Sequence, residues 1–207
     1  MENLVKSFYK DGNLKRERYF NKNGKLHREN GPAEVEYFKN GNIKHQIWYK
    51  NGNVNRENEP AFIEYFKDGN IKHQVWYENG KCYRKEKLPI AIKYYKNKNI
   101  NEISWNNKEE YYIKHDIPTN VKYNKDGSIY SEHWYSVEDK LERKNGPAGI
   151  IYWSNGNKQI ESWYKNGVLH RENGPALIYY NENGEVRDEE YYINGRSATE
   201  LQKSIIV

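Results

Sequence analysis

The clearest copy of the unit that this chain repeats is Trp163-Tyr-Lys-Asn-Gly-Val-Leu-His-Arg-Glu-Asn-Gly-Pro-Ala-Leu-Ile-Tyr-Tyr-Asn-Glu-Asn-Gly184. Related copies recur through the 207 residues, and proline marks their register. All six prolines lie 28 or 29 residues apart, at Pro32, Pro60, Pro89, Pro118, Pro147 and Pro175. A fixed period of this length is typical of repeat architectures, in which each unit packs against its neighbours.

Each proline is followed by strand-forming residues and then by a turn. A β-branched residue stands three positions after proline and a tyrosine five positions after it, as in Ile178 and Tyr180. Eleven of the 15 glycines stand in turns behind Asn or Asp, a strong hairpin signal because these residues tolerate positive φ. The sequence predicts an all-β fold, an elongated repeat array of antiparallel β-hairpins that forms an extended, twisted or rolled meander sheet.

We expect a single repeat domain over residues 1–207. Residues 1–31 form an N-terminal partial unit, residues 32–196 form six units of 28–29 residues of which the last is partial, and residues 197–207 form a C-terminal cap or tail. Ser197-Ala-Thr-Glu200 has the spacing of a helix capping box, so the last residues form either a short C-terminal helix or a loose tail.

The register of the first hairpin in each unit follows from side-chain pairing. If Lys39-Asn40-Gly41 is a three-residue loop with Gly41 left-handed, Tyr37 faces Ile43 and Glu36 faces Lys44. Apolar and opposite-charge pairs of this kind stabilise a ladder. We therefore expect positions three, five and eleven after proline on one inward face, and the tryptophans at position sixteen in the opposite phase.

One unit has lost its turn glycines. Between Pro89 and Ile117, Lys98 stands where the other units have the first turn glycine, and Asn106-Asn-Lys-Glu109 replaces the second turn. We expect its strands to pair as elsewhere, with both loops protruding or forming longer turns. This would make it the most distinctive surface of the array and a place for a partner contact.

Composition narrows the function classes. The formal net charge is +5, and the acidic and basic residues are interspersed without a long run of one sign, which argues against a nucleic-acid partner.

The single cysteine, Cys82, takes a position held by Leu26 and Val54 in other units and is predicted to be a small buried residue. No apolar run is long enough for a membrane span or signal, so we expect a cytoplasmic protein, in the host cytoplasm if its source is a virus.

No residue set typical of an active site stands out from the repeat, so we expect no enzyme activity and no cofactor. His45 and His73 are one repeat apart, about 10 Å in a regular sheet, which is too far to share a metal ion. His27 and His170 are expected to pack or form hydrogen bonds at the corner before proline.

Two rows of residues recur with the unit and are the candidate binding residues. The arginines stand four or five residues before proline, and the tryptophans stand sixteen residues after it. The rows are Arg28, Arg56, Arg84, Arg143 and Arg171, and Trp48, Trp76, Trp105, Trp134 and Trp163. The arginines form either a ladder of forked donors for carboxylate or phosphate groups, or braces paired with Glu29, Glu57 or Glu172. The tryptophans form either a second buried layer or an exposed aromatic stripe.

The unit resembles the longer variant of the MORN-type repeat, through Trp-Tyr-Lys-Asn-Gly, Leu-His-Arg-Glu-Asn-Gly-Pro-Ala and Tyr-Tyr, over roughly residues 4–196. The resemblance implies an extended antiparallel sheet in a viral or bacterial protein with a binding or scaffolding role. We expect an interaction scaffold or binding module for a protein partner. The alternatives are a binder that sequesters an anionic or nucleotide-like small molecule, and attachment to an anionic membrane surface. The sheet edges offer a further contact, with other copies of the chain.

Overall fold

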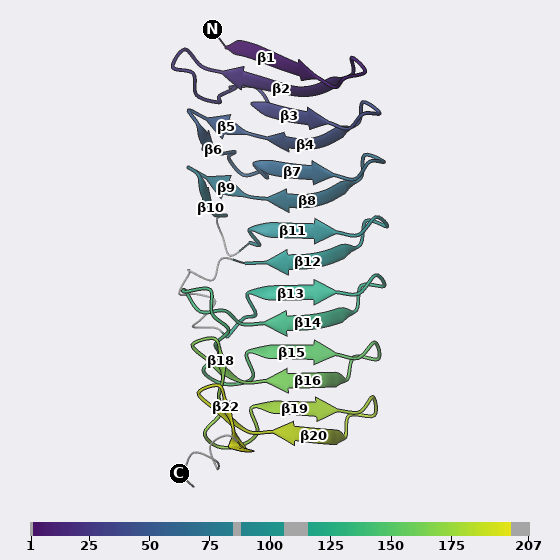
Figure 1. Ribbon diagram of the computed structural model, residues 1–207, viewed down its shortest axis with the longest axis vertical. Coiled ribbons are helices and arrows are strands. Elements are labelled where there is room, and N and C mark those ends of the chain that lie inside the picture. The colour runs from purple at the N-terminus through teal and green to yellow at the C-terminus, as the bar shows by residue number, and fades with distance from the viewer. Residues whose placement is uncertain (1, 85–87, 106–115, 200–207) are drawn as a thin grey trace. The chain divides into compact units, whose positions relative to one another are not determined.

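The computed structural model describes residues 2–84, 88–105 and 116–199, and all structural statements refer to these residues. The chain forms two compact units, Met1–Trp105 and Asn106–Val207, which are described one at a time. The regular structure is almost entirely antiparallel β-strand (Figure 1). The prediction of an all-β array of hairpins is confirmed.

The main sheet of the first unit is a meander of large hairpins. Its strands are ordered β1 (Asn3–Phe8), β2 (Leu14–Phe20), β3 (Glu34–Tyr37), β4 (Ile43–Ile47), β7 (Phe62–Tyr65), β8 (Ile71–Val75), β11 (Ala91–Tyr94) and β12 (Ile100–Ser104). In the second unit the order is β13 (Asn120–Tyr123), β14 (Ile129–His133), β15 (Gly149–Tyr152), β16 (Lys158–Ser162), β19 (Leu177–Tyr180) and β20 (Val186–Glu190). All described neighbours pair antiparallel, as a meander requires.

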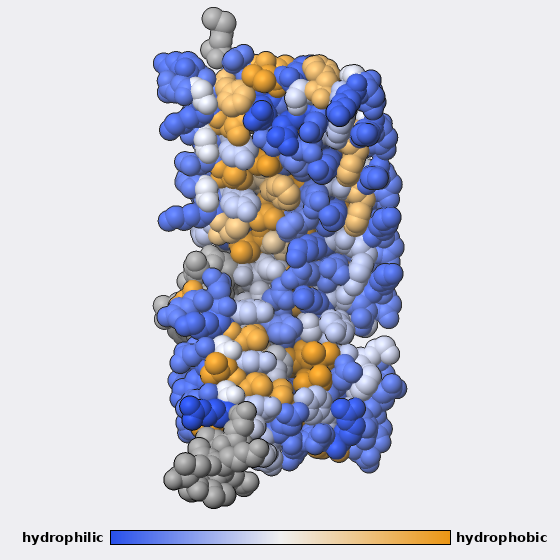
Figure 2. All heavy atoms as spheres, viewed as in Figure 1, coloured by the Kyte–Doolittle hydropathy of each residue, from blue (hydrophilic) through white to orange (hydrophobic). Residues whose placement is uncertain are grey.

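In each compact unit, small hairpins lie at one end of the large ones (Figure 1). They are β5 (Tyr49–Lys50) with β6 (Asn53–Val54), β9 (Tyr77–Glu78) with β10 (Lys81–Cys82), β17 (Tyr164–Lys165) with β18 (Val168–Leu169), and β21 (Tyr192–Ile193) with β22 (Arg196–Ser197). Within each compact unit, a backbone bond joins the two small hairpins: the Gly80 amide donates to the Val54 carbonyl at 2.9 Å, and the Gly195 amide donates to the Leu169 carbonyl at 2.8 Å. In Figure 2 the hairpin tips on both sides are hydrophilic and apolar residues lie between them.

The two kinds of hairpin use different turns. In the large hairpins the Gly41 amide donates to Phe38 and the Phe38 amide donates to Asn42, with Gly41 at φ 85°. This is the predicted three-residue loop with a left-handed glycine. In the small hairpins Asn51 and Gly52 both have positive φ, 51° and 89°, which defines a two-residue turn that suits the strand twist.

A bulge corrects part of the predicted register. Tyr37 pairs with Ile43 as expected, but Glu36 pairs with His45 because Lys44 is an extra residue in β4. The expected ion pair still forms, since the Lys44 ammonium lies 2.8 Å from the Glu36 carboxylate. The same irregularity follows the turn of the other large hairpins. A bulged residue shifts every following side chain to the other face.

The predicted faces are confirmed for positions three and five, which share the side of the core, and are wrong for position eleven and for the tryptophans. Val35 pairs with Gln46, and the Trp48 amide bonds to Ala61 in the next unit, so tryptophan shares a face with the position three residues after proline. Position eleven is exposed in most units; Ile129 is 39 % exposed. We call the shared side the tyrosine face. It comprises positions one, three, five, fourteen and sixteen after proline.

The core is thin and lies on the tyrosine face. Alanine immediately after proline is fully buried in four repeats, and the β-branched residue at position three is buried with it in three of them, as Val35, Ile63 and Ile150. In five of the six repeats the tyrosine at position five donates its hydroxyl to the residue at position fourteen of the preceding repeat. These bonds are Tyr37 to Glu17, Tyr65 to Gln46, Tyr94 to Gln74, Tyr152 to Glu132 and Tyr180 to Glu161, all between 2.6 and 2.8 Å. Tyrosine therefore contributes an apolar ring to the core and a polar link between units.

The unit without turn glycines keeps its strands, as predicted, because β11 pairs with both β12 and β8. Its first loop is not longer than the others. The Lys98 amide donates to Tyr95 and the Tyr95 amide donates to Asn99, as in the glycine turns, and Lys98 takes φ 70°. The second loop, at residues 106–109, lies outside the described residues.

Two further predictions concern single segments. Cys82 is exposed, not buried, because it stands in the short strand β10 of a small hairpin, at the margin of the core. At the C-terminus, Ala198 and Thr199 are helical, which agrees with the capping-box position; the cap or tail beyond them lies outside the described residues.

Candidate binding site

The two rows of candidate residues form one structure. Each described arginine of the row places its guanidinium over an aromatic ring of the tyrosine face. The distances from guanidinium carbon to ring centre are 3.8 Å for Arg28 on Tyr19, 3.9 Å for Arg56 on Trp48, 4.0 Å for Arg84 on Trp76, 3.8 Å for Arg143 on Trp134 and 3.9 Å for Arg171 on Trp163. Such stacking is favourable, more so when the cation is partly desolvated. We call this set the arginine–aromatic row.

Each guanidinium also forms a hydrogen bond to the backbone of the corner, at the proline carbonyl. Nη1 of Arg171 donates to the Pro175 carbonyl at 3.0 Å, and the equivalent bond forms in the other four cases. Gly174 has φ 137°, and a Cβ there would lie 3.3 Å from the Arg171 guanidinium. The glycine of the Asn-Gly-Pro segment thus supplies both the backbone bend and the space for arginine.

Within the described residues, the arginines do not form the expected ion pairs with Glu29 and Glu172. Glu29 and Glu172 pair with His27 and His170, at 2.9 and 3.4 Å. These histidines also accept backbone amides through Nδ1, as Asn194 donates to His170 at 3.1 Å, which confirms their predicted hydrogen bonding at the corner. Among the described ion pairs, Arg56 pairs instead with Glu59, which replaces the glycine before proline. The arginines are braced mainly by rings and carbonyl groups.

The tryptophans do not form an exposed stripe. Trp76 and Trp134 are 6 % and 7 % exposed, and Trp48, Trp105 and Trp163 are half-buried. They form a second layer under the arginines, which cover their outer faces. No arginine stack is described for Trp105, because residues 106–115 lie outside the described part of the chain.

The row borders a half-open groove in the first unit, with a volume of about 480 Å³. Trp76, Arg84 and Tyr83 line it together with Arg56 and Asn58. The indole Nε1 of Trp76 is buried and has no hydrogen-bond partner within the described residues. Burial lowers the pKa of Arg84, which is the direction expected for a desolvated cation.

The second unit has a larger groove of about 1080 Å³, lined by Trp134, Arg143, Trp163 and Arg171. Here an acid completes the equivalent corner. Nε and Nη2 of Arg143 donate to the two carboxylate oxygens of Asp116 at 2.8 and 2.9 Å, and Nε1 of Trp134 donates to the Asp116 carbonyl at 3.0 Å. This is a bidentate, charge-assisted contact.

Sequence reasoning missed Asp116. Its signal is visible, because an acid stands two residues before Pro118 where Asn30, Asn58, Asn145 and Asn173 stand before other prolines. Its role could not be assigned without the structure, which brings it beside an arginine 27 residues further along the chain.

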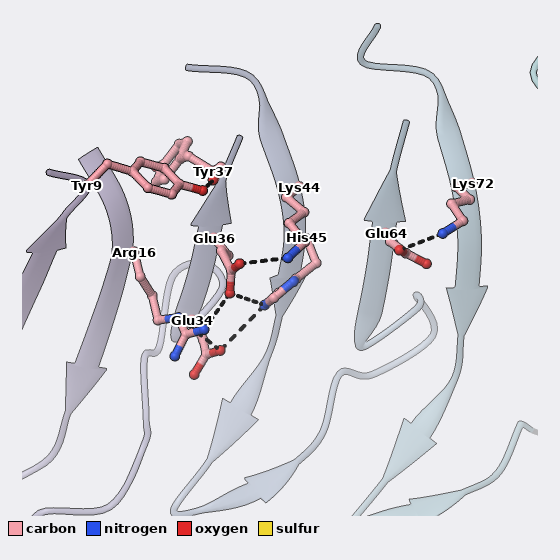
Figure 3. Close-up of polar contacts among 9 residues, drawn as sticks. All are labelled: Tyr9, Arg16, Glu34, Glu36, Tyr37, Lys44, His45, Glu64 and Lys72. Carbon is pink, nitrogen blue, oxygen red and sulfur yellow. Dashed lines mark hydrogen bonds and ion pairs between the residues drawn. The ribbon is translucent and has the colours of Figure 1, made fainter. Parts of the chain in front are cut away.

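The opposite face of the first sheet carries an ionic network (Figure 3). Glu36 is 6 % exposed and contacts Arg16 and Lys44, while His45 lies 3.4 Å from Glu34. Burial opposes the charge on Glu36, but the two cations outweigh it and lower its pKa to about 2. The network ties β2, β3 and β4 together, and we assign it to stability. In the next repeat Glu64 keeps only the Lys72 pair.

Within residues 2–84, 88–105 and 116–199, no group of three or more His, Cys, Asp or Glu side chains has the arrangement of a metal site. His45 and His73 both contact the ring of Phe62, with centroid distances of 6.2 and 5.8 Å. No helix in these ranges has the length and apolar character needed to cross a membrane. The sequence matches no protein-family model, and the search of curated proteins found no relative.

Proposed function

We propose that the protein is a non-catalytic repeat module that binds a protein partner through the grooves of the arginine–aromatic row. The observation that carries the proposal is the recurrence of one groove type in both units, with tryptophan, tyrosine and arginine in its walls. These residue types dominate the energetics of protein interfaces. Because stacking and the proline carbonyl already fix the arginines, binding has little of their side-chain entropy left to remove.

An extended peptide segment fits these grooves better than a globular knob does, since both grooves are half open to solvent and lined by residues from successive repeats. The long variant of the MORN-type repeat, which the unit resembles, supports the same binding role. A small anionic molecule is the competing ligand, because the row also offers forked donors. A peptide contacts residues along the whole groove, whereas a small anion contacts only the arginines, so variants of other groove residues distinguish the two ligands.

Selection of a displayed random-peptide library on the purified full chain tests the proposal. We expect enriched peptides whose binding, measured by titration calorimetry, falls at least about tenfold when a groove residue is changed, a loss of ~1.4 kcal/mol. Tyr83→Ala is the groove variant for the first unit, because Tyr83 is 37 % exposed and lines the groove.

The matched control is Tyr130→Ala, which removes a tyrosine that is 43 % exposed on β14 and does not line either groove. For the second unit the pair is Val137→Lys, in the groove, against Val186→Lys, outside it. Peptides that bind all four variants as they bind the natural chain, or a selection that enriches nothing, would refute the proposal. Thermal stabilisation by phosphorylated or carboxylated metabolites alone would favour the small-molecule binder.

A further inference from the structure

The corner before proline occurs in both compact units with the same backbone conformation but with a different residue two positions before proline. In the second unit Asp116 fills it, as described above. Asn58 occupies the equivalent position in the first unit, two residues before Pro60, and has the same left-handed backbone, with φ 61° against 54° for Asp116. The backbone is therefore alike in the two corners, and the carboxylate is missing from one of them.

The donors that Asp116 satisfies are left open in the first unit. Trp76 is 6 % exposed, and its buried Nε1 has no acceptor among the described residues. The described hydrogen bond of Arg84 runs from Nη1 to the Pro89 carbonyl at 3.3 Å, and its guanidinium is stacked on Trp76. Nε and Nη2, the atoms that bind the carboxylate in the equivalent Arg143, have no described acceptor. A buried donor without an acceptor costs about 1–3 kcal/mol.

We infer that the groove at Trp76 and Arg84 is a carboxylate-binding site, and that its ligand is an acidic side chain of the protein partner. Asp116 shows the binding mode within the same chain. The carboxylate accepts two parallel N–H groups from the guanidinium fork, and an adjacent acceptor of the ligand takes the indole N–H, as the Asp116 carbonyl does. The choice of a protein ligand rests on the proposed function, whereas the choice of a carboxylate rests on the comparison of the two corners.

The groove separates a carboxylate from other anions by geometry. A guanidinium fork pairs with the two oxygens of a carboxylate in one plane, and the ring of Trp76 holds the Arg84 guanidinium parallel to itself at 4.0 Å. Glu57 and Glu78 also line this groove, and their charges oppose a ligand with several negative charges such as a nucleotide. A single acidic side chain is the ligand that fits both features.

The indole N–H resonances of the full chain, labelled with nitrogen-15, provide the test. The probes are N-acetylglutamate N-methylamide and its neutral glutamine analogue, with acetate as a free carboxylate. We expect the Trp76 resonance, identified by its loss in Trp76→Phe, to move with the glutamate compound and not with the glutamine compound. The Trp134 resonance is the internal control, because its N–H already bonds to Asp116, and it should stay in place.

Two variants sharpen the test. Asn58→Asp supplies the missing acid from the chain and should weaken binding of the glutamate compound at least about tenfold, or ~1.4 kcal/mol. Arg84→Lys keeps the charge but removes the fork and should weaken binding similarly. Arg187→Lys is the matched control, because Arg187 also lies over a ring, that of Tyr179 at 5.6 Å, but lines neither groove. An unmoved Trp134 resonance in each variant reports that the fold is intact.

The inference is wrong if the Trp76 resonance does not respond to the glutamate compound, responds equally to the glutamine compound, or responds unchanged in Asn58→Asp. Tighter binding of acetate than of the glutamate compound would point to a free small carboxylate and would overturn the protein ligand. A response of Trp76 to carboxylate without any selected peptide leaves the site standing and removes the proposed function. If peptides are selected but the Trp76 resonance does not respond to the glutamate compound, the proposed function stands and the carboxylate site is refuted.

Discussion

Glu36 is a buried carboxylate whose charge is maintained by cations from neighbouring strands. Its pKa is lowered to about 2, below the ordinary value of 4.5. The ionised form therefore stabilises the fold fully above about pH 4.5, and this contribution is lost as the pH falls from there towards about 2.

Glu36→Gln should lower the free energy of unfolding by about 1–3 kcal/mol near pH 7, because Arg16 and Lys44 lose their shared partner. The difference from the natural chain should shrink as the pH falls towards about 3, where the natural carboxylate is losing its advantage. Urea unfolding at both pH values measures it. Glu64→Gln, which removes a more exposed acid with one cation, is the control and should have a smaller effect. An equal loss at both pH values would show that the charge is not the cause.

The β11–β12 hairpin shows that turn geometry can persist without the residue that favours it. Lys98 takes φ 70° in the loop position that glycine occupies in the other large hairpins. The strands on either side hold it there, since Tyr94 pairs with Ile100 and Ile92 pairs with Ile103. A left-handed conformation is unfavourable for lysine by about 1–2 kcal/mol.

Lys98→Gly should relieve this strain and raise the free energy of unfolding by up to about 1 kcal/mol, because the greater freedom of glycine in the unfolded chain offsets part of the gain. The reciprocal variant is Gly127→Lys, at φ 94° with no atom within 4 Å of an added Cβ, so its expected loss is a backbone effect. Thermal unfolding measures both. A loss for Gly127→Lys without a gain for Lys98→Gly would mean that side-chain contacts of Lys98 compensate its backbone.

In both compact units, tyrosine hydroxyls form the same bond from one repeat to the one before it, in five cases. Tyr180 donates to Glu161 at 2.6 Å, and this acid is 6 % exposed. Burial and the bond to Glu161 raise the pKa of Tyr180 to about 12. The hydroxyl therefore remains a donor over the physiological range, and the buried acid keeps its partner.

Tyr180→Phe should lower the free energy of unfolding by about 1–2 kcal/mol, because it leaves a buried carboxylate with one donor fewer. Tyr191→Phe is the matched control. It removes a hydroxyl that bonds to Glu189 at 3.1 Å, but Tyr191 is 48 % exposed, so water replaces the bond and the expected loss is much smaller than for Tyr180→Phe. Equal losses in denaturant titrations would show that the bond between units contributes nothing special.

Much of the fold could be predicted from sequence because turns and strands leave local signals. Asn-Gly and Asp-Gly gave the hairpins, and the pairing of Tyr37 with Ile43 followed from the loop length. The bulge at Lys44 could not be predicted, since lysine has no preference for such a position. Because the prediction lacked this extra residue, it assigned the tryptophans to the face opposite the core. This one error in the strand register is the reason that the shared face of tyrosine and tryptophan was not predicted.

The candidate site was predicted in its members and not in its contacts. Arg84 and Trp76 were both selected from the sequence, but their stacking depends on a corner that folds the chain back on the sheet. Asp116 was missed because its partner, Arg143, belongs to the next unit. Contacts between repeats leave little trace in the pattern of a single repeat.

The tyrosine bonds have a consequence for how such a chain changes in length. The donor at position five and the acceptor at position fourteen belong to successive repeats, so the two sides of these five junctions carry complementary groups. Unequal recombination between the coding segments of two repeats that carry both groups would add or remove a whole period and leave the new junction already matched. Selection can therefore act on the number of repeats without first repairing the core.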